Sequence, residues 1–186
     1  MADLYVALIH YPVYDKHRHV VTTAVTNIDV HDIARSCRTY GIKNLYVVTP
    51  VDALRGLVRK IIRHWSEGVG SHYNPNRKEA LELVRLERTL EGVEIDIEEE
   101  SGSTPVVVVT SARDLPNSLD FAELAAELAA TDHPYLLLLG TGWGLADEVV
   151  ERAAKRLAPI PSPAGYNHLS VRAAAAIILD RLLGTR

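Results

Sequence analysis

The sequence predicts an α/β protein with a mostly parallel sheet flanked by helices, organised as a single domain over residues 1–186. Short apolar runs alternate with longer amphipathic stretches, which is typical of parallel strands joined by helices. The run Val106–Val109 is apolar at every position, as in a strand that is covered on both faces. No internal repeat or low-complexity linker divides the chain.

The expected strands are short, and each is bounded by Gly, Pro, Asp or Thr. The acidic run at 98–100 is expected to lie in an exposed loop. The strands are expected at residues 4–9, 44–49, 93–97, 106–110 and 135–139.

The expected helices lie between these strands and have helical apolar spacing. Asp29 is expected to cap the first helix and Gly41 to end it, because these residue types are favoured at those positions. The last helix carries so many small and apolar residues that close packing is expected, either against the sheet or against another subunit. The helices are expected at residues 30–40, 51–65, 77–90, 121–130, 146–157 and 169–183.

Composition restricts the functional classes. No apolar run approaches the roughly 20 residues of a membrane span, and the N-terminus lacks the features of a signal peptide. The one cysteine, Cys37, excludes an internal disulfide and multi-thiolate metal sites, and it is expected to be a small buried residue rather than a nucleophile. His17 and His19 have only Asp15 as a nearby carboxylate, which makes a poor metal site. A cytoplasmic protein without a metal is expected.

Charge is distributed unevenly along the chain. Residues 1–90 contain 13 basic and 9 acidic residues, whereas residues 91–186 contain 7 and 15. The basic half can attract the phosphates of a nucleic acid. The alternative is a solvated helix surface on which arginine stems cover apolar neighbours.

Two irregular segments are candidate ligand loops. Residues 140–145 follow an expected strand, and ligands of open α/β sheets bind beyond the carboxyl ends of strands. Their three alternate glycines allow a tight turn and close approach of a ligand to the backbone, although the spacing is neither a dinucleotide fingerprint nor a Walker loop. A simple strand-to-helix turn is the alternative. Residues 158–168 contain three prolines, which stiffen that segment before any ligand binds.

Three ordered motifs carry a family resemblance. They are the glycine turn, the proline-rich segment with Asn167-His168-Leu169-Ser170-Val171-Arg172 opening an alanine-rich helix, and residues 26–35 followed by Tyr40-Gly41. The arrangement resembles SPOUT methyltransferases, and His10-Tyr11-Pro12-Val13-Tyr14 adds similarity to a small bacterial branch of unassigned RNA substrate. One position departs from the family's first motif, because Asp29 stands six residues before Arg35, where an Asn is usual, and Asn27 stands eight before.

The resemblance implies a C-terminal trefoil knot, in which the chain from about Ala158 threads beneath the glycine turn. It also implies a homodimer that transfers a methyl group from S-adenosylmethionine to rRNA or tRNA, at a ribose 2′-hydroxyl or a base nitrogen, and releases S-adenosylhomocysteine. An RNA-binding accessory protein without turnover and another α/β enzyme with an adenosine cofactor are the alternatives. The implied cofactor-binding residues are Thr110, Ser111, Ala112, Leu139, Gly140, Thr141, Gly142, Trp143, Gly144, Leu145, Ile160, Asn167, His168, Leu169, Ser170 and Val171.

Arg35 is the first catalytic candidate, because by family analogy it contacts an RNA phosphate or polarises the methyl acceptor. The alternative is a surface arginine paired with Asp29 or Asp32. Asp29 or Asn27 would orient the acceptor, with the Asp available as a base, and His31 is a weaker candidate.

The stretch at residues 65–78 has two interpretations. It is either a loop that stacks on an unpaired base, or Trp65 packs in the core and the Asn-Pro-Asn at 74–76 caps the next helix. The RNA-binding candidates are Lys16, Arg18, Arg38, Tyr73, Arg77 and Lys78.

Overall fold

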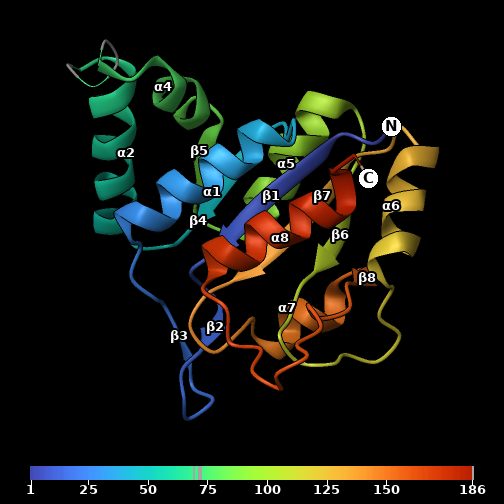
Figure 1. Cartoon of the computed structure of the whole chain (residues 1–186). Helices are drawn as coiled ribbons and strands as arrows, with labels where there is room; N and C mark the ends of the chain where they lie inside the picture. The colour runs from blue at the N-terminus through green and yellow to red at the C-terminus, as the bar shows by residue number, and fades with distance from the viewer. Residues whose placement is uncertain (69, 71–72, 186) are drawn as a thin grey trace.

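A central sheet with helices on both faces forms the core of the protein (Figure 1). The computed structural model describes residues 1–68, 70 and 73–185. Within these residues six strands pair in the order β5-β4-β1-β7-β6-β8, every pair parallel, and β2 and β3 form a separate antiparallel hairpin. The predicted class is confirmed. The strands are β1 (Leu4–Ile9), β2 (Val13–Tyr14), β3 (Val20–Val21), β4 (Leu45–Val48), β5 (Val84–Glu87), β6 (Val106–Val109), β7 (Tyr135–Gly140) and β8 (Lys155–Arg156).

The helices divide between the two faces of the sheet. Buried residues of α1, α2, α4, α6 and α8 join one apolar cluster, and those of α5 and α7 join the other. None of the helices in the described residues combines the length and apolar character needed to cross a bilayer. The described helices are α1 (Asn27–Thr39), α2 (Asp52–Ser66), α4 (Pro75–Leu81), α5 (Leu90–Ser101), α6 (Phe121–Ala130), α7 (Asp147–Arg152) and α8 (Val171–Leu183).

The central strand β1 supplies side chains to both clusters, because successive residues of a strand point to opposite faces. Leu4, Val6 and Leu8 pack under α1 and α8, whereas Tyr5, Ala7 and Ile9 face the α5 side. All six residues are buried. This explains why the strand is apolar throughout rather than alternating.

The predictions of a strand at 93–97 and of a helix continuing to residue 90 were wrong. Residues 84–87 form the edge strand β5, and Leu90–Ser101 forms α5. Leu90, Val93 and Ile97 are buried at helical spacing, and Thr89 caps the helix by accepting a hydrogen bond from Gly92 N–H. The acidic run at 98–100 is consequently the last turn of a helix and not a loop.

Two helix boundaries also need correction. The helix predicted at 146–157 ends at Arg152, because residues 155–156 pair with β6 as the short strand β8. Helix α1 starts earlier than predicted, since its N-cap is Thr26 and not Asp29. The predicted end at Gly41 is confirmed, and this glycine has the left-handed φ of +70° that suits it to the position.

The carboxyl ends of β1, β6 and β7 meet at one edge of the sheet, and α8 starts at the same edge (Figure 1). The β2–β3 hairpin follows β1 there and holds the turn after β7. Tyr14 N–H donates to Gly144 O, and Trp143 N–H donates to Tyr14 O, both at 2.9 Å. The trefoil knot implied by the resemblance stays a prediction.

Candidate functional site

A cavity of about 810 Å³ lies at this edge of the sheet. Three segments form most of it: the end of β6 with the residues after it, the end of β7 with the glycine turn, and the chain from Ala158 to α8. The end of β1 and the residues around the start of α1 complete the wall. The lining residues are His10, Thr23, Ala24, Asp29, Thr110, Ser111, Ala112, Arg113, Leu139, Gly140, Thr141, Gly142, Trp143, Gly144, Ala158, Ile160, Asn167, His168, Leu169, Ser170, Val171, Ala174 and Ile178.

The structure brings the residues implied as cofactor-binding together in this cavity, apart from Leu145. That side chain is 3% exposed and packs in the α5-side cluster beneath the turn. A Cβ on Gly140 would lie 2.9 Å from Leu145 Cγ, so this leucine supports the turn from below rather than lining the cavity.

The glycine turn depends on its glycines at two positions. Gly142 has a φ of +59° and Gly144 a φ of +102°, which other residues rarely adopt. At Gly142 a Cβ would lie 2.8 Å from Tyr14 O and 3.0 Å from Thr23 Cγ2. The hairpin therefore packs directly on the turn.

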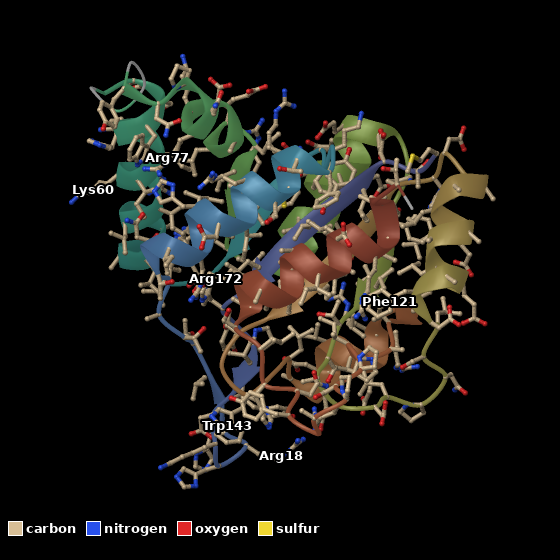
Figure 2. The ribbon with its side chains drawn as sticks, in the orientation of Figure 1. Arg18, Lys60, Arg77, Phe121, Trp143 and Arg172 are labelled. Atoms are coloured by element: carbon tan, nitrogen blue, oxygen red, sulfur yellow. The ribbon has the colours of Figure 1, made fainter. Side chains whose placement is uncertain are left out.

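The proline-rich segment is tied to the β6 loop and to α8. Asn167 Nδ2 donates to Ala112 O at 2.9 Å, which joins two walls of the cavity. Ser170 caps α8 by accepting from Ala173 N–H. The exposed rings of Trp143 and Tyr166 lie on the two loops, and Figure 2 shows Trp143 with Arg18 at the hairpin end of the molecule. Trp143 lines the cavity, so its exposed ring offers aromatic surface to a flat ligand.

A chain of side-chain hydrogen bonds connects the end of β1 to the turn. His10 Nδ1 lies 2.9 Å from Thr23 Oγ1, which lies 2.5 Å from Thr141 Oγ1. Thr141 in turn donates to Ile9 O at 2.9 Å. Burial lowers the pKa of His10 from 6.5 to about 4, against the opposing effect of the Asp29 carboxylate. Our sequence reasoning did not place His10 or Thr23 in the site, although a histidine directly after six apolar strand residues was a usable signal.

The catalytic candidates separate in the structure. Asp29 lines the cavity, whereas Asn27 and Arg35 are exposed on α1 and do not line it. Arg172 Nη1 lies 3.1 Å from Asp29 Oδ1, and its Nε lies 3.6 Å from Asp32 Oδ2. The alternative in which Arg35 pairs with these carboxylates was therefore wrong. Among the described residues the Arg35 guanidinium forms no ion pair.

The RNA-binding candidates lie in two regions, and none of them lines the cavity. Lys16 and Arg18 occupy the exposed hairpin turn, where Arg18 pairs with Asp147 at 2.7 Å and covers the Tyr14 ring. The other candidates lie on or beside α1 and α4. Arg38 pairs with Glu79, Lys78 lies 3.9 Å from Glu82, and the Tyr73 side chain is 85% exposed.

Trp65 is partly buried against the core, as one of the two interpretations proposed. Arg77 covers its ring at 4.4 Å, and the rings of His31 and His64 meet it edge-on. Burial and the Arg77 guanidinium lower the pKa of His31, which indicates a packed residue rather than a base poised near neutrality.

The start of α4 also agrees with the interpretation in which residues 74–76 cap a helix. Asn74 accepts a hydrogen bond from Arg77 N–H, and Pro75 begins the helix. The expected stacking loop also includes residues 69, 71 and 72, which lie outside the described residues.

Cys37 is buried as predicted, and burial raises the pKa of its thiol to about 12, so it is no nucleophile. Asp15 accepts hydrogen bonds from the backbone N–H groups of His17 and His19. The grouping of these three residues is therefore explained by a side-chain-stabilised turn. No group of three or more His, Cys, Asp or Glu in residues 1–68, 70 and 73–185 is arranged to hold a metal ion.

Comparisons with known proteins agree with this fold. A model of the SAM-dependent RNA methyltransferase family matches residues 3–184. A tRNA (guanine-N(1)-)-methyltransferase of Oleidesulfovibrio alaskensis is 46% identical over 182 residues, which are 98% of this chain and 42% of that enzyme. A protein of Aquifex aeolicus strain VF5, called uncharacterized, is 42% identical over 180 residues, which are 97% of this chain and 88% of that protein.

Among solved structures, the A. aeolicus TrmH/SpoU tRNA modifying enzyme matches with a TM-score of 0.56 at 21% identity, over 97% of this chain and 74% of that one. The shared fold is that of the SPOUT class, which confirms the resemblance. The chain belongs to the SAM-dependent RNA methyltransferase family. It spans less than half the length of the O. alaskensis enzyme.

Proposed function

We propose that this chain binds S-adenosylmethionine in the cavity and transfers its methyl group to RNA, either tRNA or rRNA, in the cytoplasm. The observation that carries the proposal is the convergence of three segments on one cavity. These segments are about 20 to 60 residues apart in sequence, and each supplies residues implied by the family resemblance.

The residues present fit the cofactor. A volume of about 810 Å³ lies within the range of about 300–1,000 Å³ typical of small-molecule sites. Leu139, Ile160 and Leu169 offer apolar surface to an adenine ring, and the glycine turn offers backbone N–H and C=O groups. When bound, the sulfonium supplies a methyl carbon that is already activated for displacement.

In this mechanism the protein aligns the acceptor with the methyl carbon and excludes water. The preformed turn and the proline-rich segment hold the cofactor in place. Arg35, which no described carboxylate neutralises, is available to an RNA phosphate. Lys16, Arg18 and Arg77 would extend that contact to the nucleotides on either side.

We also propose that the protein acts as a homodimer, with Arg35 serving the cavity of the partner subunit. The apolar character of α8 does not support this, since α8 packs on α1, α6 and β7 of the same chain. The support is that Arg35 does not line the cavity of its own chain. Two apolar side chains are also exposed, Ile28 by 52% next to the lining residue Asp29, and Leu169 by 43% in the lining itself. Light scattering at micromolar concentration tests assembly, and a monomer contradicts it.

Subunit mixing tests the arrangement in trans. An Arg35→Ala subunit mixed with a subunit disabled in the cavity should recover about a quarter to a half of wild-type activity, because heterodimers keep one intact site. No recovery after verified subunit exchange contradicts catalysis in trans.

Calorimetry with S-adenosylmethionine tests the cofactor, with NAD as the comparison ligand. Leu169→Glu places a charge in the cavity wall and should weaken S-adenosylmethionine binding at least tenfold. Leu57→Glu is the matched control, because Leu57 is 42% exposed on α2, outside the lining. Equal affinity in both variants contradicts the assignment of the cavity.

Turnover is tested separately by incorporation of labelled methyl groups into total RNA, followed by mass spectrometry of the nucleosides. Cofactor binding without incorporation into any RNA indicates an accessory protein that has lost turnover. Binding of NAD in preference to S-adenosylmethionine indicates another adenosine-cofactor enzyme.

A further inference from the structure

His10 is the buried histidine at the end of the central strand, and it occupies the wall of the cavity opposite the β6 loop. Its side chain is 1% exposed, so solvent does not satisfy its ring nitrogens. Nδ1 contacts Thr23, whereas Nε2 is buried with no hydrogen-bond partner in the part of the chain that the structure describes. A buried acceptor without a partner is energetically costly, which favours a ligand group that can donate a hydrogen bond to it.

The hydrogen-bond chain determines which nitrogen carries the proton. Thr141 uses its one hydroxyl proton to donate to the carbonyl of Ile9, which can only accept. Thr23 must then donate to Thr141, because the Thr141 proton is already committed. Thr23 is left to accept, so His10 Nδ1 carries the N–H and donates to it. In the neutral ring Nε2 is therefore a free lone pair.

The ring stays neutral at physiological pH, since burial lowers the pKa of His10 to about 4. Asp29, the charged group that acts on His10, is itself paired with Arg172 and bonded to the Thr26 hydroxyl. The lone pair is thus unprotonated and unpaired before any ligand binds, and no described side chain competes for it.

We propose that His10 Nε2 accepts the proton of the RNA methyl acceptor, an N–H of a base or a ribose hydroxyl, during methyl transfer. This inference rests on the proposed function. The three loops on the β6 and β7 side would surround the cofactor, which leaves the β1 end of the cavity, with His10 and Asp29, for the acceptor.

The step balances without another reactant. The acceptor atom forms a bond to the methyl carbon while the carbon–sulfur bond breaks, and the bonding electrons return to sulfur as a neutral thioether. The acceptor proton moves to Nε2, and the imidazolium releases it to water when the products leave. A weakly basic imidazole suffices, because the acceptor proton becomes strongly acidic as the new bond forms.

The test uses His10→Asn in the whole chain. The Asn amide nitrogen can occupy the place of Nδ1 and keep the donor to Thr23, while nothing replaces Nε2. We expect S-adenosylmethionine affinity within about twofold of wild type and a single-turnover methyl-transfer rate about 100- to 10,000-fold lower. His133→Asn, at an exposed histidine before β7, is the matched control and should keep the wild-type rate.

Chemical rescue separates a base from a structural role. In His10→Ala, added imidazole should restore transfer, whereas pyrazole, which has the same shape and is a much weaker base, should not. Equal rescue by both molecules shows that filling space is enough and overturns the proposal. A wild-type rate in His10→Asn, or loss of its cofactor affinity, overturns it as well. Absence of methyl transfer by the wild-type protein contradicts the proposed function itself, and this inference with it.

Discussion

The Arg172 guanidinium joins the start of α8 to the start of α1, because it contacts both Asp29 and Asp32. The carboxylate of Asp29 also accepts the Thr26 hydroxyl at 2.5 Å. Two segments that the sequence separates by 143 residues thereby form one side of the cavity. Arg172 thus holds in place an acidic side chain that lines the site.

Removal of this contact should destabilise the protein measurably. The Asp29 side chain is 14% exposed and that of Arg172 36%, so we expect Arg172→Ala to lower the free energy of unfolding by about 1 kcal/mol. Urea denaturation of Arg172→Ala, Asp29→Asn and the double variant measures the coupling. Arg59→Ala, at an exposed arginine of α2, should change stability by less than about 0.5 kcal/mol. Strict additivity of the two single substitutions contradicts the predicted coupling.

Arg35→Ala should separate binding from chemistry. Arg35 is exposed, forms no ion pair with the described residues and lies outside the cavity lining, so fold and cofactor affinity should stay near wild type. Methyl transfer to RNA should fall about 100-fold or more, since a charge that holds the acceptor is lost. Arg85→Ala, on the edge strand β5, is the control for charge alone. An equal loss of cofactor affinity assigns Arg35 to the cofactor or the fold instead.

Gly142→Val should damage the cofactor turn through the hairpin. The new side chain would meet Tyr14 O and Thr23, so we expect a loss of about 2 kcal/mol or more in unfolding free energy together with weaker S-adenosylmethionine binding. Gly102→Ala is the matched control. It also has a positive φ, of +77°, but a Cβ there meets nothing within 4 Å and it lies at the end of α5. Thermal unfolding and calorimetry check both variants, and unchanged affinity in a folded Gly142→Val protein argues against this turn as a cofactor site.

Stability should depend on pH through His10. The unfolded chain takes up a proton near pH 6.5, whereas the native ring does so only near pH 4. The free energy of unfolding should therefore fall between about pH 6.5 and pH 4, by up to about 3 kcal/mol from this residue. Urea denaturation over that range should show a smaller decrease for His10→Asn. Parallel curves for the two proteins would show that His10 does not titrate below its usual range.

The segments at 84–87 and 90–101 show where periodicity stops being informative. Each segment contains only two to four apolar residues, and their spacing is compatible with a strand as well as with a helix. Pairing with β4 makes the first a strand, and the uncovered face of the sheet is filled by the second as a helix. Local propensity was too weak to decide between them.

The sequence by itself determined the parallel α/β class, β1, β6 and β7, and the loops that follow β6 and β7, because these features depend on local apolar runs and on glycine and proline. Tertiary structure decided which polar groups meet. Thr23 and Thr141 lie 118 residues apart, and Arg172 reaches Asp29 across the start of two helices. Such pairs leave no periodic signal in the sequence. Each depends on which segments the folded chain brings together, and on which of their groups still has a hydrogen bond to donate or accept.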